Sequence, residues 1–227
     1  MPAPTARLRR AIYAAATFGL ALAGVESSRA ATSPEEWNFT VQLDGKPIGA
    51  HRFVLASAGD RYMALRSEAR FDVTLLGISL YRYRHGASER WADGCLASID
   101  ARTDDDGRLT EVRGQVVGAR FDLQVQDEGR PATARAVPAG CLMSFAYWNP
   151  ALARQKYLLD PGSGRIEQVV MASPPDVPAD LDAQAQPVRG LRIGGLAQPI
   201  DVWYVGDRWV GLDTFVSGGR RLSYRLP

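Results

Sequence analysis

Runs of alternating apolar and polar residues recur along most of the chain, and each run ends at a turn sequence. In the first run, single polar residues separate Trp37, Phe39 and Val41, and the hairpin-forming pair Asp44-Gly45 follows. Because successive side chains of a strand point to opposite faces, this alternation predicts strands with one buried face. Further strands are predicted at 48–57, 61–73, 78–91, 95–102, 109–117, 120–126, 132–137, 164–172, 188–193, 200–205, 209–216 and 220–226.

The predicted strands follow one another through short turns, as in an antiparallel meander. A single sheet of about a dozen strands curls in order to bury one face. We therefore expect a mainly β protein whose meander forms a strongly curved sheet or open barrel. In its last strand, Leu222 and Tyr224 are expected on the buried face, and Arg221 and Arg225 on a face in contact with water.

Two segments depart from the alternation. Asn149 is a good helix cap, Pro150 suits a first helical turn, and residues 151–159 are good helix formers, so one short helix is predicted there. Residues 173–187 contain many prolines and are predicted to be an exposed loop without helix or strand.

The N-terminal 30 residues have the features of a cleavable secretory signal. Arg7, Arg9 and Arg10 precede an uncharged apolar run at 11–25, which is shorter than the roughly 20 residues that a membrane-spanning helix needs. Small residues then stand at the positions expected before a cleavage site, which we predict after Ala30. We expect residues 1–30 to be a signal peptide and residues 31–227 a single periplasmic β domain, without stable membrane insertion.

Removal of this segment changes the net charge of the chain. Residues 1–30 hold four arginines and one glutamate, which leaves 23 basic and 24 acidic residues in the remainder. A chain so balanced has no basic surface for nucleic acid, and no nucleic-acid partner is expected.

The two cysteines, Cys95 and Cys141, are an even pair in a chain predicted to reach an oxidising compartment. The simplest expectation is one structural disulfide between them. The alternative is a cysteine nucleophile, which needs a histidine base, and the predicted mature chain offers only His51 and His85.

An aromatic and basic stretch at 81–85 is the first candidate site. On a strand, the side chains of Tyr81, Tyr83 and His85 share one face, and those of Arg82 and Arg84 share the other. Together with Trp91, these residues are candidates for lining a ligand cavity, in which an arginine would bind a carboxylate or phosphate. The alternative is a purely structural role, with tyrosines in the core and arginines in solvent.

A second aromatic cluster, at 145–150, immediately precedes the predicted helix. Tyr147 and Trp148 are candidate ligand-binding residues at a cavity mouth. In the structural alternative, they pin the helix to the sheet.

Motifs for metal, cofactor or hydrolytic chemistry are absent from the sequence. The acidic turn Asp104-Asp105-Asp106-Gly107 lacks the ligand spacing of a calcium loop, and Ser144 lies outside a G-x-S-x-G elbow. The sequence thus predicts no catalytic residue, no metal and no cofactor.

Four segments resemble an uncharacterised family of exported proteobacterial proteins, a domain of unknown function. They read WNFTVQLDGKPIG, LYRYRHGASERWADGCLASIDARTDDDG, CLMSFAYWNP and DVWYVGDRWVGLDTFVSGGRRLSYRL. The strand layout is also similar to periplasmic lipoprotein carriers of the Lol type, whose sheets are curved. The resemblance implies a periplasmic β fold with a Cys95 and Cys141 pair, and no activity.

Two classes of function follow. The first is non-catalytic: binding of a lipid or other hydrophobic or amphiphilic small molecule, or of an envelope protein. The second is an enzyme acting on an envelope lipid or glycan, with dispersed catalytic groups such as His85 with Glu89 or Asp93.

Overall fold

The computed structural model describes residues 33–75, 78–138, 140–174, 176–182 and 186–227. The predicted signal peptide lies outside the described residues. Thirteen strands form one antiparallel sheet in the order β12-β13-β14-β15-β16-β1-β2-β3-β4-β5-β6-β7-β8. Their bounds are β1 Glu35–Leu43, β2 Lys46–Ser57, β3 Tyr62–Leu75, β4 Ile78–Ala92, β5 Cys95–Asp105, β6 Arg108–Val117, β7 Arg120–Asp127, β8 Thr133–Pro138, β12 Val170–Ala172, β13 Val188–Gly194, β14 Ile200–Val205, β15 Arg208–Val216 and β16 Arg220–Arg225.

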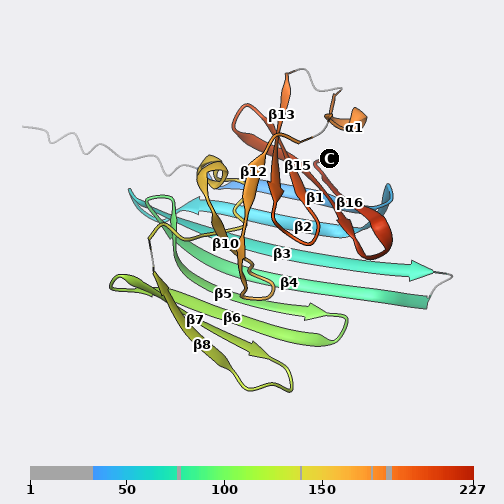
Figure 1. The fold of residues 1–227 in the computed structure, drawn as a ribbon. Coiled ribbons are helices and arrows are strands. Elements are labelled where there is room, and N and C mark those ends of the chain that lie inside the picture. Colours follow the sequence, from blue (N-terminus) through green and yellow to red (C-terminus); the bar gives the residue numbers. More distant parts are fainter. Residues whose placement is uncertain (1–32, 76–77, 139, 175, 183–185) are drawn as a thin grey trace, which may run out of the picture. The chain divides into compact units, whose positions relative to one another are not determined.

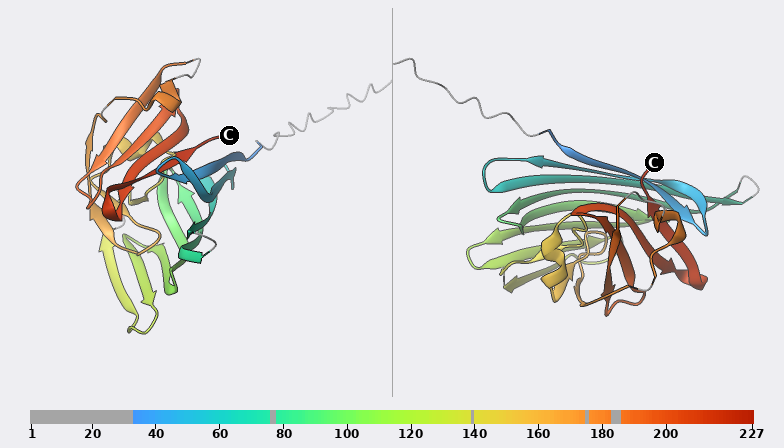
Figure 2. Two further views of the ribbon diagram at one scale, coloured as in Figure 1. Left: turned by 90° about the vertical axis from the view of Figure 1, so that its right-hand side faces the viewer. Right: turned by 90° about the horizontal axis from the view of Figure 1, so that it is seen from above.

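The sheet is strongly curved but not closed, which confirms the predicted fold class (Figure 1). The last strand, β16, pairs with the first, β1, so that Val41 lies opposite Tyr224. This pairing joins the C-terminal strands β12–β16 to the long N-terminal meander β1–β8 (Figure 2).

The tight turns follow from their sequences. In Asp44-Gly45, Asp93-Gly94 and Asp106-Gly107, both residues have positive φ angles between 50° and 90°. Two consecutive left-handed residues form the turn whose twist matches that of paired antiparallel strands.

A small second sheet packs on the inner face of the large one. It contains β9 (Met143–Ser144), β10 (Tyr157–Leu159) and β11 (Ile166–Gln168). Met143, Leu158 and Leu159 are fully buried in the same core cluster as Trp37, Phe39, Trp91 and Trp209 of the large sheet. We call residues 141–169 the inner segment, because its ribbon lies on the inner side of the curved sheet (Figure 1) and several of its residues are buried in the core.

The disulfide between Cys95 and Cys141 is present, as predicted. It joins the start of β5 to the start of the inner segment, and next to it the Leu96 amide donates a hydrogen bond to the Leu142 carbonyl, at 2.8 Å. With both thiols consumed, neither cysteine is a nucleophile.

Four local predictions were wrong. The helix over 151–159 is instead a short 3₁₀-helix, η1 (Pro150–Arg154), capped by the Asn149 side chain as expected, and the chain then enters β10. Burial of Leu158 and Leu159 in the core outweighs helix propensity there. The strand predicted at 164–172 divides at the buried Val169 into β11 and β12, which belong to different sheets.

The third wrong prediction concerns the outer face of β16. Arg225 and Ser223 are only 8% and 4% exposed, and a short helix, α1 (Ala179–Asp182), lies against Arg225; the fourth error is this helix, which falls in the segment predicted to contain none. Arg225 forms ion pairs with Asp180 of this helix and with Asp213 of β15. Another 3₁₀-turn, η2 (Ser217–Gly219), links β15 to β16. None of the helices in the described ranges is long and apolar enough to cross a bilayer.

Gly49 is the position in the sheet where a side chain is least tolerable. Its φ angle is +156°, and a Cβ atom there would lie 1.9 Å from the Arg70 carbonyl oxygen on the paired strand. We expect Gly49→Ala to lower the free energy of unfolding by about 1 to 3 kcal/mol, the usual cost of enforced backbone strain. Gly86→Ala is the matched control, since a Cβ atom at Gly86 would lie 4.0 Å from its nearest neighbour, the Ser67 carbonyl oxygen. Chemical denaturation of both variants measures the difference.

Candidate functional site

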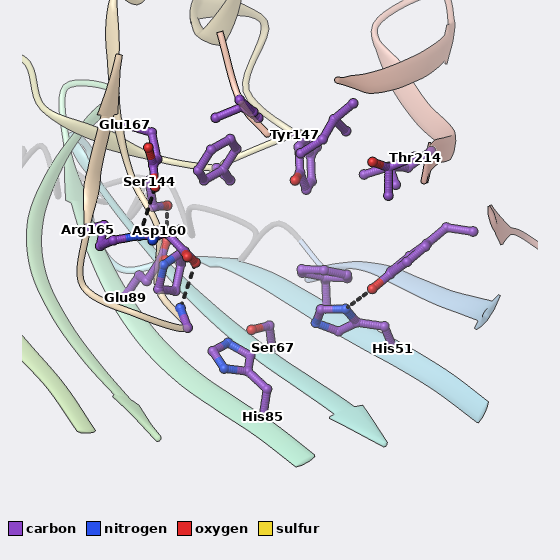
Figure 3. Close-up of a pocket in the computed structure, with 18 of the residues that line it drawn as sticks. His51, Ser67, His85, Glu89, Ser144, Tyr147, Asp160, Arg165, Glu167 and Thr214 are labelled. Carbon is purple, nitrogen blue, oxygen red and sulfur yellow. Dashed lines mark hydrogen bonds and ion pairs between the residues drawn. The ribbon is translucent and has the colours of Figure 1, made fainter. Parts of the chain in front are cut away.

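A cavity of about 760 Å³ lies on the inner face of the sheet. Its floor is formed by β2, β3 and β4, one wall by β14–β16, and the opposite side by residues 144–148 and 160–167 of the inner segment (Figure 3). Most of the lining is aromatic or aliphatic. The polar residues among it are His51, Ser67, His85, Glu89, Arg135, Ser144, Asp160, Arg165, Glu167, Gln198 and Thr214.

Two histidines face the cavity from the floor, with their ring centroids 6.4 Å apart. His51 stacks on Phe53, and its Nδ1 lies 3.3 Å from the Tyr224 hydroxyl, while its buried Nε2 has no partner in the described part of the chain. His85 Nδ1 lies 2.9 Å from Thr103 Oγ1. Burial lowers the pKa of His51 well below its usual value and that of His85 to about 4, so both rings are neutral at pH 7.

Glu89 is the most deeply buried ionisable group of the cavity, with 4% of its surface exposed. The Trp91 indole nitrogen and the Ser144 hydroxyl both donate hydrogen bonds to its Oε2, at 2.9 and 3.1 Å. Burial raises the pKa of Glu89 to about 7, although the two hydrogen bonds act in the opposite direction. A large fraction of this carboxyl group is therefore protonated at neutral pH.

The segment 160–167 carries the remaining charges of this side of the cavity. Asp160 accepts hydrogen bonds from the Gly162 amide and the Ser163 hydroxyl, which hold the turn. Arg165 pairs with Glu167 at 2.9 Å, and the Arg165 side chain is 74% exposed. The Arg165 charge therefore lies toward solvent, whereas the two histidines on the sheet floor are neutral.

Four of the predicted ligand-binding residues line the cavity: Tyr83, His85, Tyr147 and Trp148. Tyr83 and His85 point inward from β4, and Tyr83 stacks on Phe71 with centroids 5.3 Å apart. Trp148 packs edge-on against Trp91, and its indole nitrogen is buried without a hydrogen-bond partner among the described residues.

The other four candidates lie outside the cavity. The Tyr81 hydroxyl donates to Asp105, and Trp91 is fully buried behind Glu89. Arg82 and Arg84 are on the outer face of the sheet, where they pair with Asp104 and Asp72 at 3.2 and 2.8 Å. This geometry favours the structural interpretation for these two arginines.

Most polar residues of the cavity were not among the predicted binding residues, and His51, Ser67 and Ser144 are examples. Glu89 was named only for the enzyme hypothesis, yet it had a visible signal: it is an acidic residue at an inward position of an alternating strand, two residues before a tryptophan. Asp93, the other carboxylate of that hypothesis, is exposed in the β4–β5 turn and pairs with Arg61 there. In the described ranges, no group of three or more His, Cys, Asp and Glu residues has metal-binding geometry.

Comparison with known proteins agrees with this fold. No curated protein matches the chain. The crystal structure of a beta-barrel-like protein of the domain of unknown function DUF1849 from Brucella abortus superposes with a TM-score of 0.56 at 11% sequence identity, covering 86% of this chain and 96% of that one. At this identity the match shows a shared fold alone. The model of another family, the domain of unknown function DUF6134, matches residues 39–227, and the chain belongs to that family.

Proposed function

We propose that this protein is a periplasmic binding protein, exported by the signal peptide at 1–30, whose inner-face cavity holds a hydrophobic or amphiphilic small molecule. The observation that carries the proposal is the cavity itself. Its volume of about 760 Å³ is within the range of small-molecule sites, about 300 to 1,000 Å³, and its lining combines aromatic side chains with a few polar groups. The disulfide supports the export part of the proposal.

The first test is recovery of the natural ligand. The protein would be expressed with its own residues 1–30, isolated from the periplasm, and examined by N-terminal sequencing and native mass spectrometry before and after organic extraction. A start at Ala31 and an extractable hydrophobic molecule in stoichiometric amount are the expected results. Protein retained in the cytoplasm would contradict the export proposal.

A cavity-filling substitution tests the site. Ser67 lies on the cavity floor and is 6% exposed, so Ser67→Phe places a ring in the cavity. We expect about tenfold weaker binding of the apolar dye N-phenyl-1-naphthylamine, because a clash of this size costs about 1 to 3 kcal/mol. Binding is measured by the increase in dye fluorescence.

Ser88→Phe is the matched control, since Ser88 is exposed on the outer face of the same sheet. It should leave dye binding unchanged. Equal affinities for the wild type and both variants would place the dye elsewhere and contradict the proposed site.

An enzyme acting on an envelope lipid or glycan is the second candidate, favoured by one observation. His85 and Glu89 both line the cavity from β4, four residues apart, and their pKa values of about 4 and about 7 leave a neutral imidazole and a neutral carboxylic acid in one cavity between those pH values. Such a pair supplies a base and an acid. Turnover of envelope extract that is lost in His85→Ala, with dye binding retained, would support this candidate, and an unchanged extract would reject it.

A further inference from the structure

The cavity has a charge pattern that bears on its ligand. Neither Glu89 nor Asp160 forms an ion pair with another described residue, although both line the cavity. Its two arginines lie at the solvent side: Arg165 is already paired with Glu167, and the exposed Arg135 donates to the Gly164 carbonyl. The floor thus offers no cation to an anionic ligand.

The same floor offers a hydrogen-bond donor at Glu89. Both donors to Glu89 use Oε2, which leaves Oε1 without a partner among the described residues. When Glu89 is protonated, Oε2 is the carbonyl acceptor and Oε1 carries the acidic hydrogen, which is then free to be donated.

From this arrangement, and resting on the proposed function, we propose that the cavity selects apolar molecules bearing an uncharged oxygen acceptor, such as a ketone or ester carbonyl, and excludes the corresponding carboxylates. A carbonyl oxygen satisfies the Glu89 donor, which otherwise has no partner among the described residues, and an unsatisfied buried donor is costly. A ligand carboxylate would lose its hydration beside Glu89, with no cation on the floor to compensate.

The test compares two probes with ten carbons each, 2-decanone and decanoate. The ketone accepts hydrogen bonds but has no hydroxyl to donate. Titration calorimetry at pH 6 with residues 31–227 measures both dissociation constants. We expect 2-decanone to bind at least about tenfold more tightly than decanoate, because decanoate must leave a buried charge unpaired.

The pH profile identifies Glu89 as the donor. The other titratable groups that line the cavity are His51, Tyr83, His85, Arg135, Tyr147, Asp160, Arg165, Glu167 and Tyr224. The histidine pKa values are lowered and the tyrosine pKa values are raised, so these rings keep their charge between pH 6 and 8. Deprotonation of Glu89 over that interval removes the donor, and we expect about tenfold weaker binding of 2-decanone at pH 8.

Glu89→Gln is expected to remove this pH dependence, because its amide N–H group donates at every pH. Decanoate binding as tightly as 2-decanone would overturn the inference and leave the proposed function standing, since both probes would still occupy an apolar site. Absence of binding by both probes would overturn the proposed function itself. A pH dependence that persists in Glu89→Gln would overturn the assignment of Glu89 as the donor. The comparison of 2-decanone with decanoate uses the wild-type protein alone, so it does not depend on the folding of a variant.

Discussion

Replacing both cysteines with alanine is expected to lower the free energy of unfolding by about 4 kcal/mol. The reason is that the disulfide closes a loop in the unfolded chain and so reduces its conformational entropy. Cys95 and Cys141 are 46 residues apart, and the bond ties β5 to the start of the inner segment. A typical domain has only about 5 to 15 kcal/mol of stability, so the loss is a large share of the total. Urea denaturation of residues 31–227 in the oxidised wild type and in Cys95→Ala/Cys141→Ala measures it.

Arg61→Ala is a suitable control for the disulfide variant. Arg61 pairs with Asp93 in the turn next to Cys95, but the two side chains are 72% and 52% exposed. A fully exposed ion pair contributes little to stability, so the denaturation midpoint should move little. A loss of less than about 1 kcal/mol on removing the cysteines would contradict the stabilising role of the disulfide.

The second large effect is expected at Asp213, on the outer face of β15. Asp213 is 7% exposed, accepts a hydrogen bond from the Trp203 indole nitrogen at 2.7 Å, and pairs with the buried Arg225 at 3.0 Å. Asp213→Ala leaves a buried guanidinium and a buried indole N–H group without this partner. Breaking one side of a buried pair costs about 3 to 5 kcal/mol, and we expect about 3 because Asp180 still pairs with Arg225.

Asp207→Ala is the matched control for Asp213→Ala. Asp207 pairs with Arg189 at 3.0 Å, but its side chain is 85% exposed. Its removal should change the free energy of unfolding by less than about 1 kcal/mol. Equal effects of the two substitutions would show that α1 does not shield the ion pair between Asp213 and Arg225 from water.

Much of the large sheet is predictable because its signals are local. Each Asp-Gly turn and each alternating run is encoded by neighbouring residues, and β1 to β8 appear close to the predicted ranges. The errors occur where contacts distant in sequence decide the outcome. Leu158 and Leu159 favour a helix locally, yet their burial in the core places them in β10.

The candidate site is predictable only in part. The period-two rule places Tyr83 and His85 on one face and Arg82 and Arg84 on the other, as the structure has them. The rule does not tell which face is inward or how far along the strand the cavity extends. Tyr81 shares the face of Tyr83 but lies beyond the cavity, hydrogen-bonded to Asp105.

The sequence by itself determined most strands of the large sheet and their tight turns, and it favoured the pairing of Cys95 with Cys141, because adjacent residues or a simple count of thiols carry that information. Only the tertiary structure decided which faces are covered. The inner segment closes the cavity over His51 and Glu89, and α1 covers Arg225, so that polar residues at ordinary strand positions become buried. Burial depends on segments far away in the chain, and it is burial that raises the pKa of Glu89 and gives the cavity its selectivity in our proposal.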